Sequence, residues 1–239
     1  MNIKIIAIMA LLAPSFAFAE AAHNHNHLGE SNLFPYHSFT LETDYGKDKS
    51  NWDLDGWAGG DYQKLWVKSE GNVENGKLSD ANLWALYSRN IATFWDAQIG
   101  LRYDPKIQAH QRESSYVAFG INGLAPFFFE TEAYGLLRDD GLFSIHLKQE
   151  NDILITNRLV LSPSLALNIN SRSDEEYQIG SGLSDAEAKL MLRYEFTREF
   201  APYVEYSYER KFGKTAKLYD AIAEPISSNG FRLGIRFKF

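Results

Sequence analysis

The sequence predicts an all-β fold: a transmembrane antiparallel β-barrel of the bacterial outer membrane, with about twelve strands. Three observations predict it. Residues 230–239 alternate strictly between apolar and basic or glycine positions and end on the aromatic Phe239, as a strand between lipid and a wet lumen would. Aromatic residues make up 14% of the chain, and barrels need aromatic girdles at both membrane interfaces. The third observation is an N-terminal export signal.

Residues 1–19 are expected to be a signal peptide. Lys4 gives a short positive region, residues 5–12 form an apolar run too short to span a bilayer, and Ala17-Phe18-Ala19 has the small-x-small pattern of a cleavage site. The chain contains no Cys, which excludes a lipidated cysteine, a disulfide and a thiolate metal site. The exported protein is then periplasmic, secreted or in the outer membrane.

Residues 20–35 are expected to form a flexible polar arm, and residues 36–239 the barrel. His23, His25 and His27 alternate with Asn in this arm, so an extended chain places three imidazoles on one side. Neutral imidazole is a ligand for copper(II), zinc and nickel. We expect the three histidines to capture a metal ion; the alternative is a soluble arm that binds any divalent metal weakly.

Six strands are expected in the first half of the barrel, each bounded by turn residues. They lie at residues 37–45, 51–58, 61–70, 80–89, 95–103 and 115–122. The segment at 51–58 alternates poorly, but counting it gives an even strand number, as bacterial single-chain barrels have. The predicted connections are the turn Gly59-Gly60, a longer one at 72–76, a short one at 90–93, a loop at 104–112 and a tight turn at 123–126.

Six further strands are expected in the second half. They lie at residues 127–137, 142–150, 159–169, 187–196, 204–209 and 230–239. The connections are expected at 138–141, near 156–157, at 171–183, at 198–201 and at 212–229, with no convincing helical period. Loops alternate short with long from Gly59-Gly60 onwards, as periplasmic turns and outer loops do. Pro163 cannot donate to a ladder, so it is expected to mark a bulge or the register of a weak pair.

One face of most predicted strands carries charges of both signs. These inward candidates are Arg102, Glu130, Glu132, His146, Lys148, Glu150, Glu187, Lys189, Arg193, Glu195, Glu205, Glu209, Arg232 and Arg236. A soluble sandwich could show the same face to solvent and pack its apolar faces as a core, and the period alone does not exclude this alternative. The export signal, the aromatic C-terminus and the loop alternation favour the barrel.

His146 and Met191 are the soft side chains at inward positions, which makes them candidate metal ligands beside the three histidines of the arm. The inward carboxylates are either an acidic conduit for cations or the partners of inward Lys and Arg in a network that stiffens the wall. His37 is expected at the rim and His110 in a loop, without a binding role.

Two function classes are disfavoured. The formal net charge is −7 and no basic stripe stands out, so nucleic acid is not expected as a partner. An enzyme is not expected either: Ser144 and His146 share a face with no third group in view. Gly180-Ser181-Gly182 lacks the strand–turn–helix context of a nucleophile elbow.

Seven colinear blocks carry a family resemblance. They are residues 59–71 (GGDYQKLWVKSEG), 85–89 (ALYSR), 94–104 (FWDAQIGLRYD), 123–126 (GLAP), 180–185 (GSGLSD), 198–203 (REFAPY) and 209–213 (ERKFG). In these blocks, across roughly residues 50–239, the chain resembles the copper resistance protein B family (CopB/PcoB). The resemblance implies an outer-membrane barrel tied to copper tolerance, usually alongside a periplasmic multicopper oxidase. We expect outer-membrane lipid and copper ions as its partners, and both termini on the periplasmic side.

The implied function is copper resistance, in which the barrel binds copper ions and sequesters them or conducts them across the outer membrane. The alternative is a general small porin-like barrel with no specific metal role. Family members often carry a long segment rich in Met and His, whereas this arm has three His and no Met. Imidazole suits copper(II) and thioether selects copper(I), so the arm is predicted to chelate copper(II).

Overall fold

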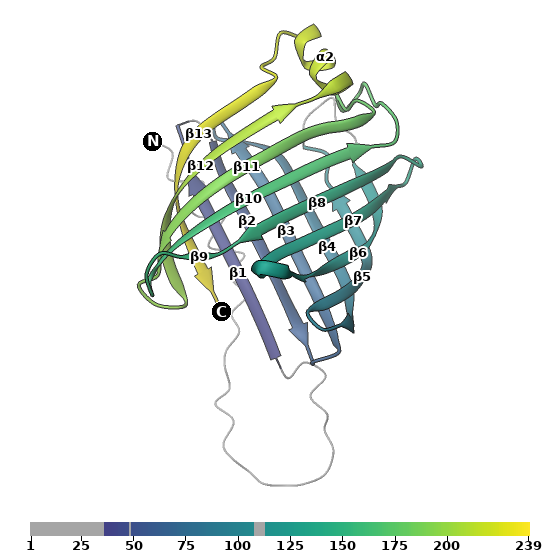
Figure 1. Cartoon of the computed structure of the whole chain (residues 1–239). Helices are drawn as coiled ribbons and strands as arrows, with labels where there is room; N and C mark the ends of the chain where they lie inside the picture. Colours follow the sequence, from purple (N-terminus) through teal and green to yellow (C-terminus); the bar gives the residue numbers. More distant parts are fainter. Residues whose placement is uncertain (1–35, 48, 108–112) are drawn as a thin grey trace, which may run out of the picture. The chain divides into compact units, whose positions relative to one another are not determined.

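The computed structural model describes residues 36–47, 49–107 and 113–239, and its strands form one sheet that closes on itself (Figure 1). The strands are β1 (Tyr36–Tyr45), β2 (Lys49–Gly59), β3 (Gln63–Glu74), β4 (Lys77–Ala92), β5 (Trp95–Asp104), β6 (Ser114–Ala125), β7 (Phe129–Arg138), β8 (Phe143–Asn151), β9 (Ile153–Leu154), β10 (Leu159–Asn170), β11 (Gly182–Tyr194), β12 (Phe200–Lys211) and β13 (Ser227–Lys238). Each strand pairs antiparallel with its neighbour, and β13 returns to pair with β1. The predicted signal peptide, arm and His110 lie outside the described residues.

Strands β8 and β9 are two parts of one strand, so the barrel has the predicted twelve. Both pair with β10 in the same register, through Ser164↔Glu150 on one side of the break and Leu161↔Ile153 on the other. The ladder lapses opposite Pro163, which has no N–H to donate. The weak pair predicted there is confirmed. The bulge predicted at Pro163 is wrong, because the register of β10 against β11 shifts between Asn168 and Ile169 instead.

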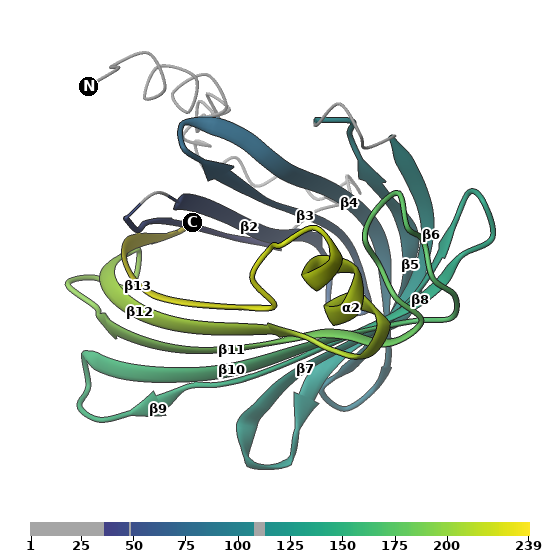
Figure 2. The same cartoon turned by 90° about the horizontal axis from the view of Figure 1, so that it is seen from above.

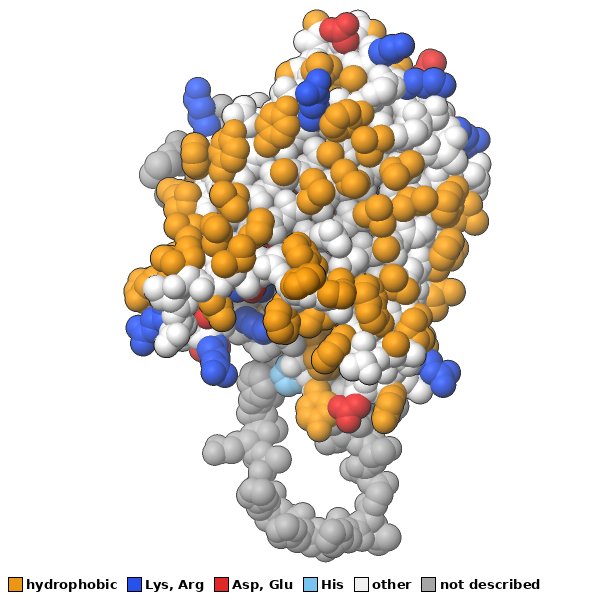
Figure 3. Space-filling view, in the orientation of Figure 1, with side chains coloured by type: hydrophobic (Ala, Val, Ile, Leu, Met, Phe, Trp, Pro, Cys, Tyr) orange, Lys and Arg blue, Asp and Glu red, His pale blue; other side chains and the backbone are white. Residues whose placement is uncertain are grey.

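Apolar side chains cover the outer wall, as the strand period predicts. Leu101, Phe231 and Leu233 are each more than 60% exposed, and Figure 3 shows hydrophobic side chains over the wall with charges gathered towards its two ends. Such exposure is unfavourable in water by about 25 cal/mol per Å² and is relieved in lipid. A closed barrel with its apolar side outward has no second sheet, so the sandwich alternative is wrong.

Several predicted connections are wrong in detail, and the turn expected at 198–201 ends earlier because β12 begins at Phe200. The segment at 72–76 is mostly strand, and β3 and β4 meet in a tight turn at Asn75 and Gly76. Both residues have positive φ, 51° and 75°, which Asn-Gly adopts readily in hairpin turns. The strict alternation of short and long loops therefore fails here. The turn expected at 123–126 is displaced, since β6 continues through Ala125 and the chain turns in the short 3₁₀ segment η1 (Pro126–Phe128).

A short helix, α2 (Gly213–Ala221), lies in the longest predicted loop, where no helix was expected. Seen from above, α2 lies over the mouth of the barrel (Figure 2). It has no side-chain cap; instead the Gly180 N–H donates to Thr215 Oγ1 at 2.9 Å. Short helices have little intrinsic stability and depend on tertiary contacts. The sequence of α2 therefore need not show a clear helical period. Within the described residues, no helix has the length and hydrophobicity needed to cross a membrane.

Candidate functional site

The candidate site is the lumen, because alternation directs nearly all charged side chains of the strands into it. Cross-strand pairing sets the inward rows: Asp53 faces Glu70 across β2 and β3, and Glu132 faces Lys148 across β7 and β8. Like charges therefore stand side by side on β2 and β3, and opposite charges on β7 and β8. Cross-strand neighbours interact strongly enough for such rows to set the local electrostatics.

Lys68 is the central cation of one row. Its Nζ donates to both carboxylate oxygens of Glu132 at 2.7 Å and lies 2.9 Å from Asp55 Oδ2. The ammonium also lies over the rings of Trp66 and Tyr134, 5.5 and 5.6 Å from their centroids. Glu132 is on β7 and Lys68 on β3, which are not neighbours, so this side chain crosses the lumen. Two carboxylates and two ring faces replace the water that a buried ammonium loses.

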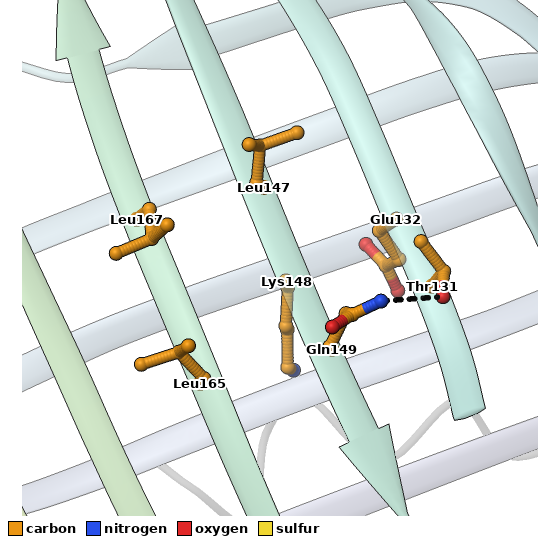
Figure 4. A pocket seen from close by; sticks show the side chains of 7 residues that line it. All are labelled: Thr131, Glu132, Leu147, Lys148, Gln149, Leu165 and Leu167. Carbon is orange, nitrogen blue, oxygen red and sulfur yellow. Dashed lines mark hydrogen bonds between the residues drawn. The ribbon is translucent and has the colours of Figure 1, made fainter.

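A second ion pair crosses the lumen beside the first. Lys148 Nζ on β8 lies 3.8 Å from Asp53 Oδ2 on β2, and these strands are diametrically opposite in the twelve-stranded wall. Figure 4 shows Lys148 and Glu132 on the adjacent strands β8 and β7. A depression of about 240 Å³ is lined by these two residues and by Leu147, Leu165 and Leu167, which alternation turns to the opposite face of the wall. We call Lys68–Glu132 and Lys148–Asp53 the cross-lumen ion pairs. At this height of the barrel, ion pairs connect opposite sides of the wall.

One side of the lumen is filled by apolar and aromatic side chains. This packed half is lined by β3 to β7 and centres on Trp84, Leu86, Ala118, Tyr134 and Leu136. The Tyr134 hydroxyl donates to Gln98. Arg102 lies between the rings of Trp84 and Tyr116, 5.0 and 5.3 Å from their centroids, and donates twice to Asp104 at 2.7 and 2.8 Å. Its charge is therefore fully partnered within the packing.

The other side of the lumen is polar. This charged half is lined by β8, β10 to β13, β1 and β2, and Arg232 lies 3.7 Å from each of Asp44, Glu187 and Glu205. Arg236 pairs with Glu42 at 3.3 Å and Lys189 with Glu187 at 3.3 Å. The predicted inward network of mixed charges is thus present. These ion pairs are long compared with direct charge-assisted hydrogen bonds of about 2.8 Å, whereas Arg193 in the same half donates to Asp152 at 2.8 Å.

A separate charge cluster joins the loop at 171–181 to the turn between β7 and β8. Arg138 donates to Asp140 at 2.9 and 2.7 Å and also to Asp174, and its guanidinium lies over the ring of Tyr177. Arg172 donates to Asp140 as well, at 2.7 Å. The hydrogen bonds from Arg138 hold the pKa of the Asp140 carboxyl well below its usual range.

The two predicted ligands of the lumen are not brought together. His146 Nδ1 lies 2.8 Å from Asn168 Oδ1, whereas Met191 is buried opposite Ser162. Positions 162 and 168 of β10 are about 20 Å apart at 3.3 Å per residue, so His146 and Met191 cannot share a metal ion. His23, His25 and His27 lie outside the described residues. In the part of the chain that the structure describes, no three His, Cys, Asp or Glu side chains are placed to hold a metal.

The Ser–His pair considered from sequence does not form. Ser144 donates to Asn170, and the described partner of His146 is Asn168. Because an amide oxygen only accepts, Nδ1 carries a proton in this contact. His37 lies in β1 near its start, as expected for a rim residue.

Sequence reasoning missed the residues that cross the lumen from the first strands. Lys68, Asp53 and Asp55 were not among the inward candidates, although Lys64, Trp66, Lys68 and Glu70 alternate along β3 with a period of two. That alternation could have placed Lys68 inward. It could not have identified Glu132 as its partner, because the period of a strand says nothing about distances across a barrel.

Comparisons with known proteins agree over most of the chain. The family model described as "Copper resistance protein B precursor (CopB)" matches residues 36–239. The chain is 38% identical over 188 residues to "Copper resistance protein B homolog" of Pseudomonas syringae pv. tomato, and 36% identical over 189 residues to "Copper resistance protein B" of Escherichia coli. Each match covers 79% of this chain and 63% of the relative, so the chain spans less than two thirds of these relatives' length.

Solved structures support the fold. The barrel is similar to the NanC porin with a TM-score of 0.56 at 15% identity, covering 85% of this chain and all of that one. It is similar to the KdgM porin with a TM-score of 0.52 at 10% identity, covering 84% of this chain and 99% of that one. At such low identity these likenesses show the outer-membrane barrel fold alone.

Proposed function

Because the chain belongs to the copper resistance protein B family, we propose that it contributes to copper tolerance by binding copper ions and conducting them across the outer membrane. The observation that carries this proposal is the family match over residues 36–239, which includes every described strand. The charged half of the lumen supports it, since side chains of both signs line its inward face. Copper is the cargo in this proposal and not a resident cofactor.

We assign the capture step to the arm. His23, His25 and His27 supply three imidazoles at alternate positions, a donor set that suits copper(II). The C-terminal Phe239 lies at the same end of the barrel as the start of β1, where Phe39 and Phe239 exchange backbone hydrogen bonds of 3.1 and 2.8 Å. Short turns of outer-membrane barrels face the periplasm, so we place both termini there. A periplasmic multicopper oxidase is the expected neighbour of the arm.

A strain lacking the gene tests this proposal. We expect the deletion to shift the copper concentration that stops growth by at least about twofold, with zinc and nickel tolerance unchanged. The full chain should restore tolerance, whereas a variant with His23, His25 and His27 all changed to Ala should restore it only in part. Heat-modifiable migration of membrane fractions controls for folding of each form. Unchanged copper tolerance in the deletion strain would contradict the proposal and favour a general porin.

A further inference from the structure

The centres of the two halves of the lumen differ in their access to water. In the packed half, Leu86 and Leu136 are 2% and 4% exposed. In the charged half, the side chains of Lys148, Lys189 and Asp53 are 32%, 36% and 38% exposed, although all three point inward. The exposed surface of an inward side chain faces the lumen. Water therefore reaches the charged half and not the centre of the packed half.

The cross-lumen ion pairs form the boundary between the two halves. Lys68 and Glu132 connect β3 with β7 and close off the packed half, while Lys148 and Asp53 connect β8 with β2 beside them. The two pairs differ in strength. Lys68 makes direct hydrogen bonds of 2.7 Å to its partner, whereas Lys148 lies 3.8 Å from Asp53, beyond the usual hydrogen-bond range of about 2.7–3.2 Å.

Lys148 is one ammonium among several carboxylates. Glu132 is its cross-strand neighbour and Glu150 follows it on the same face of β8. Asp53 stands beside Glu42 on β1 and Glu70 on β3. Glu132 and Glu42 have closer cations of their own, Lys68 and Arg236. Among the described residues, the Asp53 carboxylate is ion-paired with Lys148 alone, at the long distance of 3.8 Å, and an ion pair without a direct hydrogen bond is easily exchanged.

We propose that small cations cross the barrel only through the charged half, and that Lys148 is the residue that sets its selectivity. This inference rests on the proposed function for its cargo. Lys148 acts as a tethered counter-cation: its ammonium occupies the space beside Asp53 that a hydrated metal cation takes during passage. A cation that enters competes with the ammonium for the carboxylate, and no bond is made or broken. Anions do not enter this space, because the surrounding carboxylates repel them.

Ion selectivity in planar bilayers tests the role of Lys148 without copper. In a potassium chloride gradient, Lys148→Met should shift the reversal potential towards cation selectivity and raise the conductance, whereas Asp53→Asn should shift it towards anions. Lys49→Met is the matched control, because Lys49 pairs with Glu74 outside the cross-lumen pairs, and it should behave as the unmodified protein. Identical reversal potentials for all four proteins would overturn the role of Lys148. If Lys148 and Asp53 were only structural, the two substitutions would lower stability without shifting the reversal potential in opposite directions.

Cysteine accessibility tests the route. The chain has no Cys, so a single introduced cysteine is the only target of a charged methanethiosulfonate reagent. Lys189→Cys in the charged half should react and lose conductance, while Leu136→Cys and Leu86→Cys in the packed half should not react. Heat-modifiable migration shows that each variant is folded, and two packed-half variants guard against one that is not. Block at Leu136→Cys or Leu86→Cys as strong as at Lys189→Cys would overturn the route. Failure of copper tolerance with these results intact would reject only the proposed function.

Discussion

Lys68 shows how single residues hold this barrel together. A buried ammonium is unfavourable unless its lost hydration is replaced, and here Glu132, Asp55 and the rings of Trp66 and Tyr134 replace it. The side chain is also one of the few links between strands that are not neighbours in the wall. Its removal leaves two carboxylates facing an apolar cluster without their cation.

We expect Lys68→Met to lower the free energy of unfolding by about 3 kcal/mol, the magnitude found when one partner of a buried ion pair is removed. Urea titration of the folded protein in lipid, followed by tryptophan fluorescence, measures this change. Lys49→Met is the control, since its ion pair with Glu74 is exposed and should contribute less than about 1 kcal/mol. Equal losses in the two variants would show that Lys68 stabilises no more than a surface lysine does.

For single residues, the sequence predicts whether a side chain faces the lumen or the lipid, but not which residue it contacts. The inward positions of Lys148, Lys189 and Arg232 follow from alternation and are confirmed by their ion pairs. The partners of Lys68 and Lys148 could not be predicted, because Glu132 and Asp53 are distant in sequence and the period carries no information about the far wall. His146 and Met191 share a face as predicted, yet they lie at different heights.

The loop at 171–181 is joined to the turn between β7 and β8 by charged hydrogen bonds. Arg138 donates to Asp140 and Asp174, and Arg172 donates to Asp140 from the loop itself. These bonds stabilise the charged carboxylate, so the pKa of Asp140 is lowered in the folded protein. A carboxyl with a lowered pKa adds stability above its unfolded pKa of about 4 and loses that contribution as the pH falls further.

We therefore expect Asp140→Asn to melt at a lower temperature than the unmodified protein at pH 7, and the difference to shrink as the pH falls below about 4. Thermal unfolding by circular dichroism at a series of pH values measures both curves, and other carboxyls cancel in the difference. A difference in melting temperature between the two proteins that stays constant from pH 7 to pH 3 would contradict the role given to the Asp140 carboxylate.

Elements were predictable where local chemistry decides them. Every predicted strand is present, including the weak segment at 51–58, because partners on both sides supply what its own pattern lacks. Helix α2 was missed because its Thr215 contact comes from a distant loop. The break at Pro163 was predictable from one missing donor, whereas the register shift at Asn168 and Ile169 has no such signal in the sequence.

The whole molecule is a barrel with an asymmetric lumen, half packed and half charged. Its class was predicted from three features: strand alternation up to the aromatic Phe239, aromatic content and an N-terminal export signal. The asymmetry does not follow from them, because Trp84 and Leu86 occupy inward positions that the same period gives to charges elsewhere. The fold and the alternation of its strands were therefore predictable from the sequence, whereas the distribution of packed and charged side chains inside the lumen required the structure.

Copper flux tests the central claim that this barrel conducts copper ions. The mature protein, refolded into liposomes that contain a copper-sensitive dye, would be compared with a form lacking residues 20–36 and with protein-free liposomes. If the barrel conducts copper, copper(II) should enter with both forms, and more slowly with the truncated form at low copper, where capture by His23, His25 and His27 limits the rate. Entry no faster than in protein-free liposomes for either form would contradict conduction and leave sequestration as the role of the family fold.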